Sequence, residues 1–171
     1  MGKPAKKKPS RLIAQPGLQY AALPYRRGED EVEILLVTSR ETQRWVIPKG
    51  WPMKGKAPYA AAAREALEEA GVVGKVGKEA IGVYHYVKRL KNGAPLDCVV
   101  DVFPLQVVRQ RKRWPEQGQR TGHWFSVPEA AEAVDEPELQ ELILRFGQDL
   151  AQNPAQTDAT PSQADAAPGT D

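Results

Sequence analysis

The segment from Ala57 to Ala70 constrains the fold of this chain more than any other, because it carries a full set of helix signals. Pro58 suits the first helical turn, where its missing N–H group leaves no hydrogen bond unmade. Four consecutive alanines follow at positions 60–63, and alanine has the highest helix propensity of all residues. Gly71 suits the position just after a helix, where the backbone turns left-handed. The sequence therefore predicts one helix from Ala57 to Ala70.

This helix carries an unusual set of acidic side chains. At about 100° per residue, it sorts its side chains into an apolar face and an acidic face. The predicted apolar face comprises Ala60, Ala63, Leu67 and Ala70, and the acidic face opposite comprises Glu65, Glu68 and Glu69. Neighbouring carboxylates repel one another, and the helix macrodipole disfavours negative charge near the C-terminal end. A divalent cation would explain the arrangement, since magnesium prefers carboxylates together with phosphate oxygens. A solvated acidic surface is the alternative, and the helix alone does not decide.

The loop before the helix adds features suited to phosphate. Residues 48–56 read Pro-Lys-Gly-Trp-Pro-Met-Lys-Gly-Lys, which predicts a cationic connection between a strand and the helix. Glycine lets backbone groups approach a ligand or a metal closely, and lysine ammonium groups suit phosphate. A cationic glycine loop beside a carboxylate face is what combined phosphate and metal chemistry requires. The loop therefore favours a ligand site over a solvated surface.

The rest of the chain predicts a mixed domain. Asn92-Gly93 stands between two β-favouring runs, which is the strongest short hairpin signal. The predicted strands are 19–24, 32–38, 44–47, 80–88, 96–108 and 122–127, and two further helices are predicted over 128–134 and 137–150. In the last helix an apolar stripe comprises Leu139, Leu142, Ile143, Phe146 and Leu150, which suits packing on a sheet. Strands mixed with a few helices indicate an α+β fold or an α/β/α sandwich.

Composition bounds the domain organisation. The chain has 171 residues, of which 41% are hydrophobic, enough for one domain with a core. We expect that domain over residues 17–150, preceded by a disordered basic arm over 1–16. Residues 151–171 lack large apolar side chains, so we expect a disordered tail there.

Charge and cysteine content exclude several classes of function. The net charge is only +2, and residues 1–11 carry five cations and no acids, which leaves the domain itself neutral overall, so we do not expect a nucleic-acid partner. Cys98 is the only cysteine, which excludes an internal disulfide and a paired-cysteine metal site. The chain has neither an apolar run of roughly 18 residues nor a signal-peptide pattern, so we expect a cytoplasmic protein without membrane contact.

Together, the loop and the helix resemble the Nudix box, whose pattern is G-x5-E-x7-R-E-U-x-E-E-x-G-U with U aliphatic. The residues that fall at the family's spacing are Gly50, Arg64, Glu65, Glu68, Glu69, Gly71 and Val72. Lys56 stands where the family has its first glutamate, and Ala66 stands where a larger aliphatic residue is usual. The resemblance covers about residues 17–147. It implies the family's fold, an α/β/α sandwich around a central mixed β-sheet.

The resemblance also implies a role for each matching residue. Glu65, Glu69 and the backbone carbonyl of Gly50 would bind the metal, with Mg²⁺ expected and Mn²⁺ as the alternative. Glu68 would be the base that activates water, and Arg64 would orient the carboxylates by charge-assisted hydrogen bonds.

The motif does not specify which residues bind the substrate or whether a further carboxylate binds the metal. Candidate substrate-binding cations are Lys49, Lys54, Lys56 and Arg44, and candidates for an additional carboxylate are Asp101 and Glu116. Other cations, such as Lys88, Arg109 and Arg120, add charge that matches an anionic substrate. A lysine at position 56 can neither support the metal cluster nor pair with the arginine of the motif, so the number of metal ions stays open.

The implied activity is metal-dependent hydrolysis of a phosphoanhydride bond in a polyphosphorylated small molecule. Segments 44–50 and 114–116 look most like the branch that acts on diphosphoinositol polyphosphates and diadenosine polyphosphates, and related nucleoside diphosphate derivatives stay open. The alternative is a Nudix-fold sensor that binds its ligand without cleaving it. Lys56 favours that alternative, and the intact glutamate trio argues against it. The sequence leaves open whether the chain is a monomer or a homodimer.

Overall fold

A computed structural model describes residues 16–153 of the chain as eight strands and three helices. The strands are β1 (Gly17–Arg27), β2 (Val32–Thr38), β3 (Trp45–Val46), β4 (Lys49–Gly50), β5 (Val72–Val76), β6 (Gly82–Arg89), β7 (Pro95–Gln110) and β8 (Gly122–Ser126). The helices are α1 (Pro58–Ala70), α2 (Val127–Ala133) and α3 (Pro137–Gln152). Helix α3 extends two residues into the predicted tail. Otherwise the predicted arm and tail fall almost entirely on residues 1–15 and 154–171, which lie outside the described residues.

The strands form one mixed sheet. Its main path runs β3-β2-β1-β7-β5, while β4 pairs with β1, β6 with β7 and β8 with β2. Strands β1 and β7 are parallel, from the pair Gly17–Cys98 to the pair Tyr25–Gln106. The other pairings within this sheet are antiparallel. The predicted central mixed sheet is confirmed.

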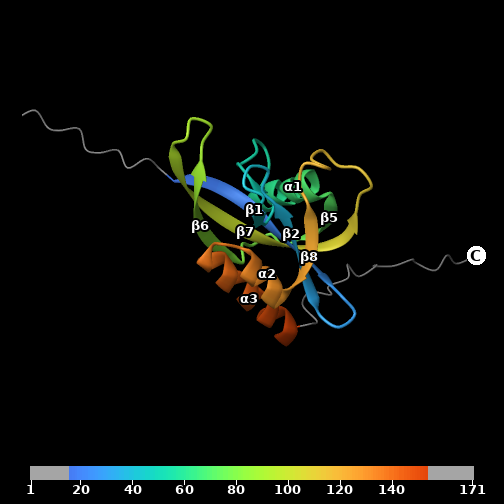
Figure 1. The fold of residues 1–171 in the computed structure, drawn as a ribbon. Helices are drawn as coiled ribbons and strands as arrows, with labels where there is room; N and C mark the ends of the chain where they lie inside the picture. Colours follow the sequence, from blue (N-terminus) through green and yellow to red (C-terminus); the bar gives the residue numbers. More distant parts are fainter. Residues whose placement is uncertain (1–15, 154–171) are drawn as a thin grey trace, which may run out of the picture.

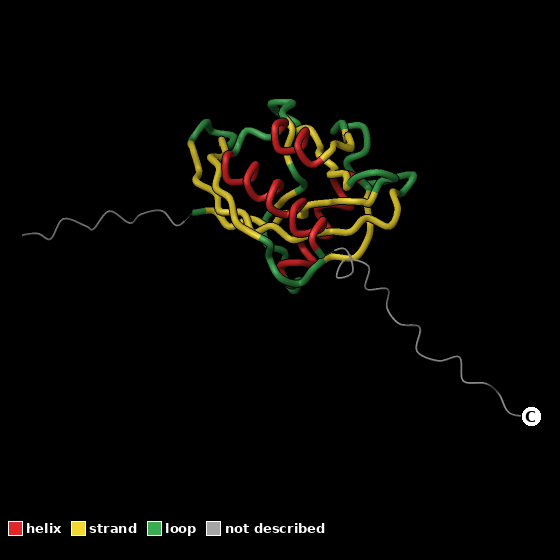
Figure 2. The backbone as a smooth tube through the Cα atoms, turned by 90° about the horizontal axis from the view of Figure 1, so that it is seen from below, coloured by secondary structure: helices red, strands yellow, loops and turns green. Residues whose placement is uncertain are grey.

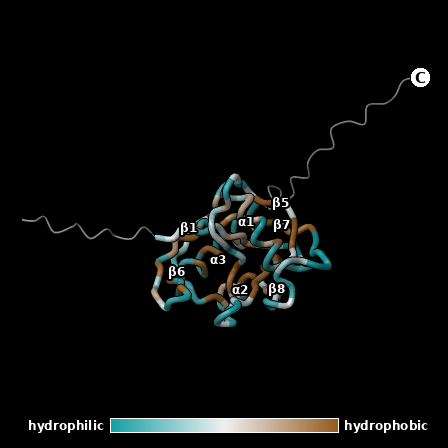
Figure 3. Tube along the Cα trace, turned by 90° about the horizontal axis from the view of Figure 1, so that it is seen from above, coloured by the Kyte–Doolittle hydropathy of each residue, from teal (hydrophilic) through white to brown (hydrophobic). Residues whose placement is uncertain are grey.

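The helices cover both faces of this sheet (Figure 1), and each face carries its own hydrophobic core. On one face, Ile143 and Phe146 of α3 pack against sheet residues such as Leu23. On the other face, Ala66 of α1 packs against Phe103. The hydropathy colouring of Figure 3 places apolar stretches in the middle of the molecule, and Figure 2 shows the loops projecting at its periphery. This is the expected α/β/α sandwich.

Helix α1 begins and ends as the sequence predicts, but its buried face differs from the prediction. Pro58 starts it, and Gly71 ends it with φ 71° and an N–H bond to the carbonyl of Leu67. The residues buried on this helix are Ala61, Ala62, Ala66, Glu69 and Ala70, so the predicted stripe through Ala63 and Leu67 is wrong. Alanine occupies almost every side of this helix, so periodicity could not identify the packed side. Glu69 consequently lies on the buried side and not on a solvated acidic face.

Other elements follow the predictions with local exceptions. The Asn92-Gly93 hairpin is confirmed, with φ 81° at Gly93 and β6 paired to β7. The stripe of α3 is buried as predicted. The predicted strand 44–47 is present as the shorter β3, which pairs with β2, and β4 lies within the predicted loop after Pro48 and pairs with β1. Strand β5 follows Gly71 directly and was not predicted.

Within residues 16–153, no helix combines the length and the apolar character that crossing a membrane requires.

Candidate active site at the carboxylates of helix α1

Gly50 brings a backbone segment into contact with the acidic side of α1. Strand β4 pairs with β1, which fixes Gly50 opposite Tyr20. A Cβ atom at position 50 would overlap the carboxylate of Glu65. A larger side chain here would have to displace that carboxylate, so glycine leaves the backbone of residue 50 beside the Glu65 oxygens.

Glu69 is almost fully buried, at 6% exposure, between two cationic residues. Its Oε2 accepts a hydrogen bond from the backbone N–H of Lys49 at 3.3 Å. Its Oε1 lies 3.3 Å from Nη2 of Arg120. The loop before α1 and the segment before β8 thus meet at this one carboxylate.

Both carboxylates, those of Glu65 and Glu69, resist ionisation. Burial, with the added charges of Glu68 and Glu116, raises the pKa of Glu65 from 4.5 to about 7. Burial also raises the pKa of Glu69 to about 7, although Arg120 and Lys49 oppose the shift. A divalent cation beside these oxygens would favour the ionised form of both groups.

The donor set fits a magnesium-like ion with few protein ligands. Across the described part of the chain, no three His, Cys, Asp or Glu side chains are gathered closely enough to hold a metal ion as they stand. The Glu65 carboxylate lies against the backbone of Gly50, and Glu69 accepts a hydrogen bond from the N–H of the preceding residue, Lys49. Magnesium commonly binds one or two carboxylates and completes its coordination shell with water and phosphate oxygens. The donor groups present here are of that type.

Glu68 differs from its two neighbours. Its side chain is half-exposed, and its Oε1 accepts a hydrogen bond from Nε of Arg64 at 2.9 Å. The expected contact of Arg64 with the carboxylates is thus present, at Glu68. An accessible glutamate held by an arginine is able to accept a proton from a nearby water.

The segment between β7 and β8 closes over the C-terminal turn of α1. The ring of Trp114 packs where a side chain on Gly71 would stand. The backbone N–H of Glu116 donates to the carbonyl of Glu68 at 2.9 Å. Glu116 therefore lies next to the carboxylate cluster, and its charge acts on both Glu65 and Glu69.

Asp101, the other candidate carboxylate, belongs to strand β7. It alternates along β7 with Val100 and Val102, which belong to the core under α3, so its half-buried side chain is on the α1 face. The charges that most affect the pKa of Glu65 are those of Glu68, Glu116, Arg120 and Arg64, and Asp101 is not among them. Of the two candidates, Glu116 is the one that the fold brings to the cluster.

A cavity of about 230 Å³ opens beside Glu69. Its charged lining comprises the cations Arg40, Arg44, Lys49, Lys88, Arg89 and Arg120, and the acids Glu41 and Glu69. The ammonium group of Lys49 lies 4.9 Å from the ring centre of Tyr86, which also lines the cavity. Burial lowers the pKa of Lys49 to about 8, while the charge of Glu69 opposes the shift. Cations outnumber acids in this lining, which suits a polyanionic ligand.

The four predicted substrate-binding cations separate into two groups. Lys49 and Arg44 line the cavity, whereas Lys54 and Lys56 are exposed in the turn before α1 and do not line it. Arg44 is committed to an internal ion pair, because its Nη1 lies 2.6 Å from Glu136. The carboxylate of Glu136 therefore partly neutralises the positive charge that Arg44 contributes to the cavity.

Arg120 is the main site residue whose role the sequence did not reveal. It is one of many cations in the chain, and no motif distinguishes it from the exposed run Arg109–Arg113. Its side chain is only 11% exposed and pairs with both Glu69 and Glu116. The contact arises because the β7–β8 segment folds back onto α1, which sequence spacing does not encode.

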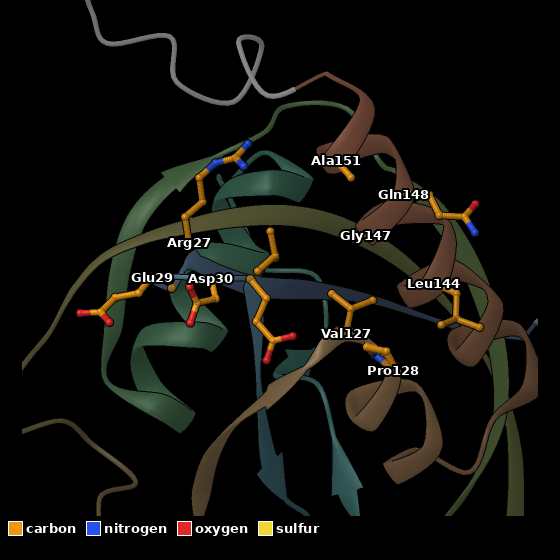
Figure 4. A pocket seen from close by; sticks show the side chains of 12 residues that line it. Arg27, Glu29, Asp30, Val127, Pro128, Leu144, Gly147, Gln148 and Ala151 are labelled. Atoms are coloured by element: carbon orange, nitrogen blue, oxygen red, sulfur yellow. The ribbon is translucent and has the colours of Figure 1, made fainter.

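A larger cavity of about 690 Å³ lies elsewhere, between the β1–β2 turn and α3 (Figure 4). Leu144 and Gly147 of α3 and Val127 and Pro128 of α2 line it together with the turn. Residues of α1 and the carboxylate cluster take no part in its lining. Size alone therefore does not identify the site, and we assign it to the smaller cavity beside Glu69.

Comparison with known proteins agrees with this fold. A sequence model of the NUDIX domain matches residues 18–146. The chain is 34% identical over 114 residues to Nudix hydrolase 17, mitochondrial, of Arabidopsis thaliana, covering 67% of this chain and 60% of that protein. It is also 34% identical over 111 residues to diphosphoinositol polyphosphate phosphohydrolase 3-alpha of Mus musculus, covering 63% of each. The chain thus spans about three fifths of the length of these curated relatives.

Solved structures with low sequence identity share the fold. A C. elegans Ap4A hydrolase binary complex matches with a TM-score of 0.60 and 22% identity, covering 80% of this chain and 98% of that one. The NUDIX domain of Shewanella oneidensis NrtR, complexed with ADP ribose, matches with a TM-score of 0.58 and 16% identity, covering 83% and 94%. With the domain match extending from β1 to α3, and with the motif glycine and glutamates meeting in one place, this chain belongs to the NUDIX domain family.

Proposed function

We propose that this chain is a divalent-metal-dependent pyrophosphohydrolase that cleaves a phosphoanhydride bond in a polyphosphorylated small molecule. The observation that carries the proposal is a pair of carboxylates, the half-buried Glu65 and the buried Glu69, beside a cation-lined cavity to which Glu69 contributes. Buried carboxylates that resist ionisation suit a cation, and the cavity suits the polyanion that the cation would bring with it.

In the proposed reaction, water attacks one phosphorus of the anhydride and the bridging P–O bond breaks. Glu68 takes the proton from the attacking water, and Arg64 holds that carboxylate in place. Lys49 binds a phosphate oxygen of the substrate and offsets its negative charge. A Mg²⁺ or Mn²⁺ ion held by Glu65, Glu69 and the Gly50 carbonyl would supply the charge that stabilises the other phosphate oxygens.

The proposed substrates are diphosphoinositol polyphosphates, diadenosine polyphosphates and related nucleoside diphosphate derivatives. The mouse relative is a diphosphoinositol polyphosphate phosphohydrolase, and the similar C. elegans structure is an Ap4A hydrolase. For this chain, the six cations lining the cavity support a substrate with several phosphate groups.

A sensor that binds such a ligand without cleaving it is the second candidate. Lys56, in the place of the first motif glutamate, is the observation that favours it. Against it, a binding module has no need for the burial that, with the repulsion of neighbouring glutamates, raises the pKa of Glu65 and Glu69 to about 7.

The deciding experiment measures product formation from a panel of diadenosine polyphosphates, inositol pyrophosphates, ADP-ribose, nucleoside triphosphates and capped RNA, with Mg²⁺ and with EDTA. We expect Mg²⁺-dependent cleavage of one class, reduced at least about 100-fold in Glu68→Gln and in Glu69→Gln. Glu141→Gln, on the exposed side of α3, is the matched control and should keep full activity. Tight binding of one compound without turnover would instead establish the sensor.

A further inference from the structure

We propose that Arg120 is a positioning residue that couples the proposed metal site at Glu65 and Glu69 to the cation-lined cavity beside Glu69. Its side chain pairs with Glu69 and Glu116, and a divalent cation bound beside those carboxylates would turn it to the phosphate groups of the ligand. This inference rests on the proposed function, since it needs both a metal ion and a polyphosphate ligand.

The contacts of Arg120 place its charge between the two carboxylates. Nη2 lies 3.3 Å from Oε1 of Glu69 and 3.3 Å from Oε1 of Glu116. Nη1 donates a hydrogen bond to the carbonyl oxygen of Thr38 at 3.2 Å. The guanidinium thus lies where it offsets the charge of both carboxylates, and Arg40 adds a second cation 3.5 Å from Oε1 of Glu116.

The backbone around Arg120 is fixed, so only its side chain is able to change partners. The N–H of Thr121 donates to Oγ1 of Thr38 at 2.9 Å, and the N–H of Glu116 donates to the carbonyl of Glu68 at 2.9 Å. These bonds tie the segment to β2 on one side and to α1 on the other. A movement of the whole segment would break both, whereas a rotation of the arginine side chain breaks neither.

Arg120 also lines the cavity with Lys49 and Arg40, so a phosphate group there lies within its reach. A guanidinium binds carboxylate and phosphate with the same planar pair of donors. A divalent cation at Glu65 and Glu69 repels Arg120, and an anion in the cavity attracts it. Both effects displace the side chain in the same direction, so each ligand favours the binding of the other.

The test measures each ligand alone on the full chain. Mn²⁺ binding is followed by the loss of the free-ion electron paramagnetic resonance signal. Tripolyphosphate binding is followed by calorimetry in EDTA. At pH 8.5, where protons compete little for the carboxylates, we expect Arg120→Gln to bind Mn²⁺ about fivefold more tightly, because a competing cation is removed, and to bind tripolyphosphate at least about tenfold more weakly. A purely structural role would weaken both, so the opposite signs are diagnostic.

Three further variants keep the test decisive. Arg120→Met removes the charge but keeps the aliphatic stem, and it must reproduce both directions even if the glutamine variant folds poorly. Arg120→Lys keeps a charge and loses the planar donors, so Mn²⁺ affinity should stay near wild type while tripolyphosphate binding falls. Arg113→Gln, an exposed cation of the same segment, should change neither affinity by more than about twofold.

The outcomes separate this inference from the proposed function. Mn²⁺ affinity that falls or stays unchanged in both Arg120→Gln and Arg120→Met overturns the role of Arg120, and so does unchanged tripolyphosphate binding. Failure of the wild-type chain to bind Mn²⁺ contradicts the proposed function as well. Because neither measurement needs turnover, opposite signs support the coupling even if no compound in the panel is cleaved.

Discussion

The carboxylate of Glu65 lies directly against the backbone of Gly50, and a methyl group on residue 50 would occupy the position of its oxygens. Glu65 and the residue 50 carbonyl are two of the three proposed metal ligands. We therefore expect Gly50→Ala to weaken Mn²⁺ binding at least about tenfold, because Glu65 must move away from the site. Mn²⁺ titration with magnetic-resonance detection measures this change directly.

Gly55 provides the matched control for that variant. It has φ 77°, and nothing stands within 4 Å of the position of its missing side chain. Gly55→Ala should cost about 1 kcal/mol of stability from backbone strain and leave Mn²⁺ affinity unchanged. Equal loss of Mn²⁺ affinity in the two variants would show that Gly50 has no special relation to Glu65.

The buried Glu69 predicts an unusual pH dependence of stability in EDTA. Its pKa is about 7 in the folded protein and 4.5 in the unfolded chain, so the folded state binds more protons between these values. Stability from this group is present below about pH 4.5 and is lost as the pH rises to about 7. The melting temperature of Glu69→Gln should therefore rise relative to wild type across this window.

Thermal unfolding at several pH values, with Glu141→Gln as control, checks that expectation. The control should follow wild type throughout, because its carboxylate is exposed. Addition of Mg²⁺ at pH 8 should stabilise wild type more than Glu69→Gln, since a ligand that binds only the folded state stabilises it. A constant difference between Glu69→Gln and wild type at all pH values would contradict the raised pKa.

Lys49 predicts an upper pH limit for phosphate binding. Its pKa is lowered to about 8, so it loses its positive charge above that pH while the arginines keep theirs. We expect tripolyphosphate affinity, measured by calorimetry in EDTA, to fall above pH 8 in wild type. In Lys49→Arg the affinity should stay nearly constant up to pH 9.5. A parallel decline in both proteins would assign the effect to another group.

The ion pair of Arg44 with Glu136 predicts a contrast in stability between neighbouring acids. Glu136 is buried and lies 2.6 Å from Nη1 of Arg44, whereas Asp135 is 73% exposed and lies 3.7 Å away. Glu136→Gln should lower the free energy of unfolding by about 2 kcal/mol, since it leaves a half-buried arginine without its counter-charge. Asp135→Asn should change it by less than about 0.5 kcal/mol. Urea denaturation of the two variants distinguishes these values.

Much of the fold was predictable because, in most elements, the local sequence favours the same structure that packing in the core requires. Val32–Thr38 was predicted with the bounds that β2 has, since a polar turn precedes this continuous β-favouring run. The ends of α1 followed from Pro58 and Gly71, which act through the backbone alone. Strand β5 was missed because it contains Gly74 and Lys75 in five residues and gains its order from pairing with β7.

The site was predictable only as far as the linear motif extends. The approach of Gly50 to Glu65 follows from spacing that the motif encodes. The burial of Glu69 and its contact with Arg120 depend on how α1 packs and where the β7–β8 segment folds back, which are tertiary effects. Lys54 and Lys56, chosen for their charge and position in the loop, lie outside the cavity because the turn before α1 is exposed.

The parallel pairing of β1 with β7 has a consequence for how the protein is made. Gly17, near the start of the domain, takes Cys98 as its neighbour, and β7 also carries β5 and β6. Such non-local pairing is slow, because a long loop must close before its contacts form. During synthesis, α1 leaves the ribosome with its three glutamates well before β7 does. A nascent chain therefore carries its carboxylates exposed, and the refolding rate should respond more to core substitutions in β7 than to changes within α1.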